Sequence, residues 1–352
     1  MNGYKIPHFG LQRQSKNLSN ELLEITDKVL QEGQFIDGFY TKSFEKFLRF
    51  YTGARYAITV HSGTQALYFI AKHLYNKLPK HEKIPAVVIP NLTYPATLNA
   101  FIDAGFEVVL GDTDKCGILS NDFDNLYYLK CLIGLYGKQP WDNNQETTIV
   151  DGAQHWLVAD GKIGRGMAIS FDPTKNLPAT GNGGAVITND TSLYEFVMDY
   201  KNNGKYNDHI SYGTNSKLSE LDCAHLMVRS KYLADWQTRR KQIAEYYIDS
   251  FTNLPIRCLT EKQDTHAYQK FVIYTDKRNS LHTHLITEGI ESRIHYEKTL
   301  GELTLCNNLV KPDMLSVSMM LVRGVLSLPI YPELTDIEIE IIANVIKKFY
   351  NA

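Results

Sequence analysis

Short apolar runs alternate with helix-like stretches through the first third of the chain, and this order constrains the fold more than any other feature. Apolar runs of four or five residues are typical of buried strands, and the stretches between them have helical spacing. A strand, a helix and a second strand in this order favour parallel pairing, because parallel strands need a crossover connection. We expect strands at 56–60, 86–89 and 106–110 and helices at 64–74 and 95–104.

Later segments extend the sheet and add a smaller unit. We expect further strands at 131–135, 147–150, 167–171 and 185–188, then a long helix from 218 to about 247. After Pro255 the pattern predicts a strand near 271–274, a helix near 281–288 and a terminal helix over 336–349. Because 352 residues exceed what one core usually serves, we expect a large domain at 1–235 and a smaller C-terminal α+β domain at 236–352.

Composition excludes several classes of protein. A net charge of −2 gives no reason to expect nucleic-acid or membrane binding. The five cysteines form no CxxC pair, which favours reduced thiols over a zinc site or a disulfide framework, so we expect no metal. No signal-like start and no apolar run of about 18 residues is visible. We therefore expect a soluble, cytoplasmic protein.

An acidic residue ends one of the predicted strands. In the segment IVDGAQHW, Asp151 follows an apolar run and should lie at the carboxyl edge of the sheet, where α/β proteins bind ligands. By itself such an aspartate can equally be a helix cap or a metal ligand. Gln154 follows three residues later and could lie beside it.

A lysine occupies the connection between two later strands. Lys175 lies in SFDPTKN and precedes a glycine-rich segment. The simpler interpretation of Thr174-Lys175-Asn176 is an exposed lysine in a turn. In a partly dry pocket, however, the ammonium form is disfavoured, and the free amine can form a Schiff base with a carbonyl cofactor.

The segment VHSGTQAL joins the first predicted strand to a helix. This geometry presents the backbone amides of a helix N-terminus to a phosphate. Gly63 would permit close approach and Thr64 would add a hydroxyl. An ordinary helix cap has the same residues, so this motif alone does not decide the function.

Together these segments resemble the DegT/StrS family of pyridoxal-phosphate-dependent sugar nucleotide aminotransferases. The resemblance covers nearly the whole chain and implies the type I aspartate aminotransferase fold. It is carried, in order, by SGTQAL, IPNLTYPATLNAFIDAG, VDGAQ, SFDPTKN and GTNSKLSELDCA.

The resemblance also implies a role for each matching residue. Lys175 would form the Schiff base and move the proton, while Asp151 would face the pyridine nitrogen of the cofactor. Gln154 would bind the ring hydroxyl and Tyr94 would stack on the ring. The phosphate would be held by Gly63, Thr64, Gln65, Ser170 and, from a neighbouring subunit, Asn215. A shared site of this kind implies a homodimer.

The chain departs from the family at positions around the site. Asn182 stands where the family has glutamate, Asn203 where it has histidine and Lys217 where it has arginine; the section 112–144 is short. His295 and Tyr296 match a substrate-side element of the family, and a purely structural role is the alternative.

The resemblance implies that the substrate is a nucleotide-linked 4-keto-6-deoxyhexose and that glutamate donates the amino group. A 3-keto sugar nucleotide is the main alternative. Dehydratases of the family have histidine in place of the Schiff-base lysine, so Lys175 argues against that branch. A non-catalytic regulatory or binding protein on the same fold is a second alternative, and a nicotinamide-linked oxidoreductase is a third that lacks the GxGxxG motif.

Overall fold

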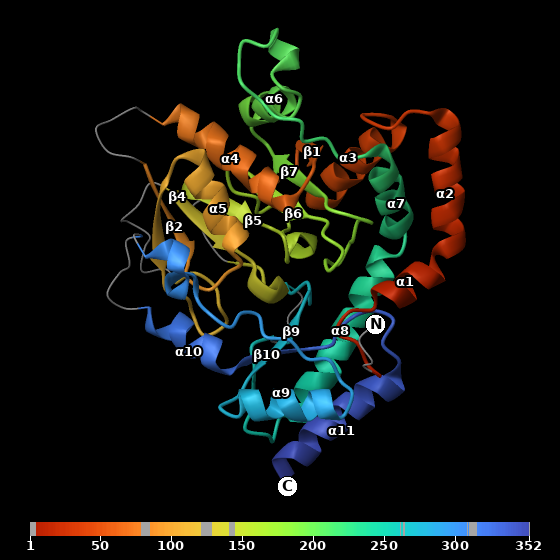
Figure 1. Cartoon of the computed structure of the whole chain (residues 1–352), viewed down its shortest axis with the longest axis vertical. Helices are drawn as coiled ribbons and strands as arrows, with labels where there is room; N and C mark the ends of the chain where they lie inside the picture. The colour runs from red at the N-terminus through yellow and green to blue at the C-terminus, as the bar shows by residue number, and fades with distance from the viewer. Residues whose placement is uncertain are drawn as a thin grey trace.

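A computed structural model describes residues 5–78, 85–120, 129–140, 145–260, 262, 265–307, 309 and 315–351. Its centre is a seven-stranded sheet with helices on both faces (Figure 1). The strand order is β1-β7-β6-β5-β4-β2-β3. The strands are β1 (Tyr56–Val60), β2 (Ala86–Pro90), β3 (Glu107–Gly111), β4 (Leu129–Ile133), β5 (Thr148–Asp151), β6 (Met167–Ser170) and β7 (Gly184–Thr188).

The sheet is mostly parallel, as the sequence predicts, and β7 is the one strand of the seven whose direction is opposite to that of the others. Because β6 and β7 are antiparallel, the connection 171–183 begins and ends at one edge of the sheet. That edge is where β1, β2 and β5 also end. The topology therefore brings residues from four separate segments to one place.

Helices bury both faces of the sheet. Alternate residues of β1 show the principle, since Ile58 packs into one core cluster and Ala57 into the other. The first cluster includes α4 (Gly63–Lys77), α5 (Pro95–Ala104) and α6 (Thr191–Tyr200), and the second includes α3 (Phe39–Thr52) and α7 (Glu220–Ser230). Strands that are buried on both faces consist of nearly continuous apolar residues, which explains why the sequence predicts these strands well.

A smaller three-stranded antiparallel sheet, with order β10-β9-β8, forms a second centre. Its core also contains Ile6, which bridges to Ile290. The boundary at residue 235 would fall inside α8, and it stays a prediction. The elements around this sheet are α8 (Leu233–Phe251), β8 (Arg257–Cys258), β9 (Phe271–Tyr274), α9 (Arg278–Thr287), α10 (Ser316–Gly324), β10 (Val325–Leu328) and α11 (Asp336–Asn351).

Two expected elements are corrected. The helix predicted from 218 to about 247 is two helices, α7 and α8, which are separated at Lys231 and Tyr232. There the backbone N–H groups of Lys231 and Tyr232 donate to Val228 and Arg229, three residues back, which tightens the last turn and ends α7. The strand expected at 131–135 is β4 at 129–133, and a 3₁₀ turn follows it at Leu135–Gly137.

The N-terminal elements are α1 (Leu11–Asn17) and α2 (Ser19–Glu32). Helix α2 ends at Gly33, which takes the left-handed conformation with φ of 66°. Among the described helices, none is long and apolar enough to cross a bilayer. Within the section 112–144, residues 121–128 and 141–144 lie outside the described residues.

Candidate active site

A cavity of about 550 Å³ opens at the carboxyl edge of the large sheet. Segments that follow β1, β2, β5 and β6 form one side of it, and residues near β9 and β10 form the other. It brings together most of the residues that the sequence singles out: Gly63, Thr64, Tyr94, Asp151, Gln154, Ser170, Lys175, His295 and Tyr296.

Asp151 ends β5 on the floor of this cavity. Its carboxylate accepts hydrogen bonds from the Thr97 hydroxyl at 2.9 Å and from the Ala153 backbone N–H at 3.1 Å. Burial raises the pKa of Asp151, while these two bonds and the charge of Lys175 act in the opposite direction. A buried carboxylate of this kind is suited to a cationic ligand nitrogen, which would lower its pKa.

Lys175 lies in the connection between β6 and β7. The loop is held locally, because the Lys175 N–H donates to the Asp172 carbonyl at 2.9 Å and the Asp172 carboxylate accepts from Thr174. Burial lowers the pKa of the Lys175 amine, and the charges of Asp151 and Asp172 oppose this shift. A depressed pKa enlarges the fraction of neutral amine, which is the nucleophilic form.

The loop between β1 and α4 is packed tightly against the end of β6. A Cβ atom on Gly63 would lie only 2.7 Å from the Ser170 Cβ. The Ser62 side chain caps α4 by accepting from the Gln65 N–H at 3.2 Å. The first turn of α4, Thr64 and the Ser170 hydroxyl therefore form a cradle of donors whose shape and polarity fit a phosphate.

Gln65 is the exception within this loop. Its backbone N–H is committed to Ser62, and the residue lines a neighbouring hollow with Tyr68 and Asp103 rather than the main cavity. The structure thus does not bring Gln65 to the cavity. On the first turn of a helix successive residues point in different directions, which sequence proximity alone does not reveal.

Gln154 and the His295–Tyr296 pair connect the two walls. The Gln154 carbonyl oxygen accepts from the Tyr136 N–H at 2.7 Å, and Gln154 also hydrogen-bonds Tyr296. His295 lies 2.9 Å from the Ser327 hydroxyl through Nδ1, and burial lowers its pKa to about 2. Tyr94 is 60% exposed, and its ring centroid lies 6.1 Å from that of Tyr296.

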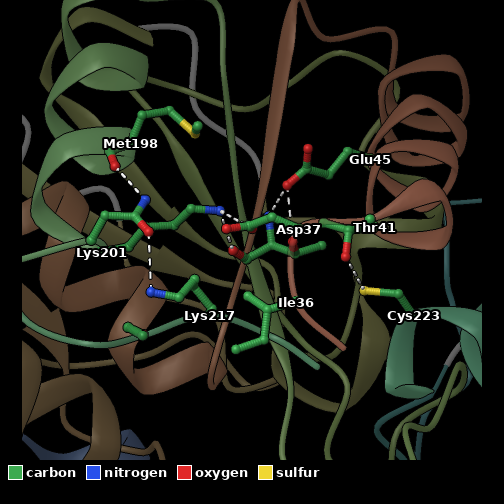
Figure 2. Close-up of polar contacts among 12 residues, drawn as sticks. Ile36, Asp37, Thr41, Glu45, Met198, Lys201, Lys217 and Cys223 are labelled. Carbon is green, nitrogen blue, oxygen red and sulfur yellow. Dashed lines mark hydrogen bonds and ion pairs between the residues drawn. The ribbon is translucent and has the colours of Figure 1, made fainter. Parts of the chain in front are cut away.

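Asn215 is exposed and lies outside the cavity of its own chain. It forms a β-bridge with Asn202, whose side chain accepts from Lys217 at 3.1 Å. The buried Lys201 donates to the Thr59 carbonyl of β1 at 3.2 Å, which ties the segment around Asn202 to the large sheet. Its amine also lies 4.0 Å from the Asp37 carboxylate (Figure 2). An outward position agrees with a residue supplied to a neighbour, and that role stays a prediction.

Several cavity residues were not singled out from the sequence. Lys270 precedes an apolar strand, a context in which a lysine is unusual, and that signal could have identified it. Arg293 lies two residues before His295, but no local feature of the sequence distinguishes it from a surface arginine. Phe9 comes from the distant N-terminus, and only the tertiary fold brings it to the cavity. Asn182, one of the departures from the family, also lines it.

A nucleophilic amine, a facing carboxylate and a phosphate cradle in one cavity fit pyridoxal phosphate, and on this α/β fold they define a pyridoxal-phosphate-dependent aminotransferase. Comparison with known proteins identifies the particular group. The chain belongs to the DegT/DnrJ/EryC1/StrS aminotransferase family, whose sequence model matches residues 16–120 and 153–347.

Characterised relatives and solved structures agree with this assignment. A dTDP-3-amino-3,6-dideoxy-alpha-D-galactopyranose transaminase from Aneurinibacillus thermoaerophilus is 28% identical, over 98% of this chain and 99% of the relative. The crystal structure of a family aminotransferase from Brucella abortus is 26% identical with a TM-score of 0.88, over 98% and 99% of the two chains. S. venezuelae DesV superposes with a TM-score of 0.89 at 26% identity, over 99% of each chain.

Proposed function

We propose that this enzyme transfers the amino group of glutamate to the keto carbon of a nucleotide-linked deoxysugar, with Lys175 as the covalent anchor of the cofactor. The observation that carries the proposal is the placement of Lys175 and Asp151 in one cavity, within reach of each other's charge. A regulatory protein on the same fold would have no need for a buried amine of lowered pKa opposite a carboxylate.

Each cavity residue then has a definite task. Pyridoxal phosphate, when bound, supplies an electron-withdrawing ring. Asp151 would keep a proton on the ring nitrogen. The Lys175 amine would act as the base that takes a proton from the amino-bearing carbon of the substrate, and then as the acid that gives the proton back. The cofactor would be held by Gly63, Thr64 and Ser170 at its phosphate and by Gln154 and Tyr94 at its ring.

The position of the keto group has two candidates. The sequence resemblance favours C4 of a 4-keto-6-deoxyhexose. Names of relatives favour C3 instead: besides the Aneurinibacillus enzyme, a dTDP-3-amino-3,4,6-trideoxy-alpha-D-glucose transaminase from Streptomyces venezuelae is 29% identical. We propose both as substrates to be compared directly, with the 3-keto sugar nucleotide first.

Support for glutamate as donor comes from the name of a further relative. A 3-oxo-glucose-6-phosphate:glutamate aminotransferase from Bacillus subtilis is 28% identical over 83% of this chain and 71% of the relative. Its acceptor is a sugar phosphate, so simple sugar phosphates belong in the same substrate panel. The common requirement is a keto sugar that carries phosphate.

We also propose that two copies of the chain share their sites, with Asn215 of each reaching the phosphate cradle of the other. Mixing inactive Lys175→Ala and weakened Asn215→Ala proteins tests this. If the sites are shared, a mixed dimer contains one site with both defects and one with neither, so activity should exceed that of either parent. Mixtures that never exceed their parents, although exchange of subunits is demonstrated, would contradict sharing.

The central experiment follows the cofactor. Purified protein with pyridoxal phosphate should absorb visible light, and borohydride should bleach it and attach the cofactor to the peptide containing Lys175. The Lys175→Ala protein should lose this attachment and all turnover, whereas the exposed Lys46→Ala should keep both. Attachment at the other buried cavity lysine, Lys270, would refute the assignment. Incubation with glutamate and the sugar panel, with product analysis by NMR, identifies the substrate.

A further inference from the structure

Lys270 is a second lysine of the cavity, more deeply buried than Lys175, and the proposed chemistry does not use it. It lies directly before β9 on the wall opposite the large sheet and is 5% exposed. Its amine donates to the side-chain Oε1 of Gln269 at 2.7 Å, and the side-chain Nε2 of Gln269 donates to the Thr174 backbone carbonyl at 3.0 Å. Two hydrogen bonds thus connect Lys270 to the residue beside Lys175.

The surroundings of this amine are mainly basic. Lys175 and Arg240 are among the charges that act on it most strongly, and Asp172 is the acidic group among them. Its charge in turn acts on His8 and His295. Burial lowers the pKa of Lys270 well below its usual value. An ammonium ion at this point is unfavourable without an anion, and a bound oxyanion would remove that penalty.

Arg293 is a second basic residue that lines the cavity outside the proposed cofactor site. Its guanidinium lies 5.0 Å from the centre of the Phe9 ring and 2.7 Å from Glu291. These contacts fix the direction of the side chain, which remains 46% exposed. The buried Lys270 and the half-exposed Arg293 thus line the same cavity as Lys175 and add two basic groups to it.

We propose that Lys270, with Arg293, forms a subsite that binds the oxyanion of an incoming substrate and so determines which substrates react. The inference rests on the proposed function, because it assumes that the cofactor occupies the Asp151 and Lys175 end of the cavity. A carboxylate of the amino donor and a phosphate of the sugar share this chemistry.

The carboxylate of the amino donor suits Lys270 better. In an amino acid the carboxylate is bonded directly to the carbon that reacts at Lys175, whereas a sugar ring separates a nucleotide phosphate from its keto carbon. Lys270 lies close enough to Lys175 for the charges of the two amines to interact. Arg293, which is more exposed than Lys270, is the candidate for the more distant group.

Separate measurement of the two half-reactions distinguishes these sources. In Lys270→Met, we expect the rate of the glutamate half-reaction at low donor concentration to fall at least about thirtyfold, as when one partner of a buried charge pair is removed. The keto-sugar half-reaction should stay within about threefold, and Lys270→Arg should recover part of the loss because it restores the charge. Lys298→Met, an exposed lysine outside the cavity, should match wild type in both.

Several outcomes would overturn the inference. An unchanged glutamate half-reaction excludes the donor subsite, and a loss confined to the sugar half-reaction assigns Lys270 to the sugar phosphate instead.

Binding of glutarate to the holoenzyme provides a readout that needs no turnover. Wild type should bind it at least about tenfold more tightly than Lys270→Met, and equal affinities would sink the subsite even if the enzyme proved inactive with glutamate. Visible absorbance and borohydride attachment at Lys175 show that each variant is folded and loaded. Wild type that lacks a glutamate half-reaction, but binds glutarate through Lys270, would contradict the proposed donor while leaving the subsite intact.

Discussion

Gly63 and Ser170 pack against each other so closely that a methyl group on Gly63 would lie 2.7 Å from the Ser170 Cβ and 3.1 Å from its Cα. Gly63 begins α4 after β1, whereas Ser170 is the last residue of β6, and the two meet at the point where the proposed phosphate cradle forms. The contact explains why glycine is required here: the limit is space, since a side chain would displace either α4 or the end of β6.

Replacement of Gly63 by alanine should therefore weaken binding of the cofactor. We expect the dissociation constant for pyridoxal phosphate to rise at least tenfold, equivalent to about 1.4 kcal/mol, when fluorescence or absorbance titration is used. Gly181→Ala is the matched control, because it lies in the neighbouring loop with nothing within 4 Å of an added Cβ. Equal affinities in the two variants would show that the close approach has no bearing on the cofactor.

Asp151→Asn should reduce turnover without preventing attachment of the cofactor. The amide keeps the size of the side chain and can still accept from Thr97, but it removes the negative charge opposite Lys175. We expect kcat to fall about a hundredfold or more, the scale for loss of one preorganised electrostatic partner. Steady-state kinetics and borohydride labelling measure the two effects, with the exposed Asp235→Asn as control. A near-normal kcat would refute the role of Asp151.

Glu220→Gln should destabilise the large domain. Glu220 is fully buried and its carboxylate accepts from the N–H groups of Gly38 and Tyr40 and from the hydroxyl of Thr41, which caps the N-terminus of α3. Loss of the charge at a helix cap should lower the free energy of unfolding by about 2–3 kcal/mol in urea titrations. The control is Glu24→Gln, which removes an exposed carboxylate that pairs with Lys28. This variant should leave the midpoint of urea unfolding unchanged. A Glu220→Gln protein as stable as wild type would exclude the capping role.

Stability should fall as the pH is lowered because of buried neutral histidines such as His155. Burial lowers the pKa of His155 to about 3, whereas an unfolded histidine has a pKa of about 6.5. Below pH 6.5 the unfolded state therefore binds a proton that the native state does not bind. At pH 5 this difference lowers the free energy of unfolding by about 2 kcal/mol per histidine. His155→Gln should be less stable than wild type at pH 7.5, but its free energy of unfolding should fall less than that of wild type when the pH is lowered. Parallel pH dependences in urea unfolding would contradict this.

Local pattern was sufficient for most of the large sheet because its strands are buried on both faces. The bounds predicted for β1 and α5 agree with the structure, and those for β2 and β6 differ by one residue. Pattern failed where a local turn interrupts a good helical composition, as at Lys231 and Tyr232. The motif residues Asp151, Lys175 and Ser170 line one cavity, whereas Gln65 lines a neighbouring hollow, because its direction depends on how α4 enters the structure.

The sequence by itself determined the order of strands and helices and the identity of the reactive groups, since apolar periodicity and motif spacing are local properties. Only the tertiary structure decided which wall faces those groups. Lys270, Arg293 and Phe9 come from segments that are distant along the chain, and burial and mutual charge arise only when these segments pack together. The lowered pKa of Lys270 and the contact of Arg293 with the Phe9 ring are consequences of that packing, and no linear pattern encodes them.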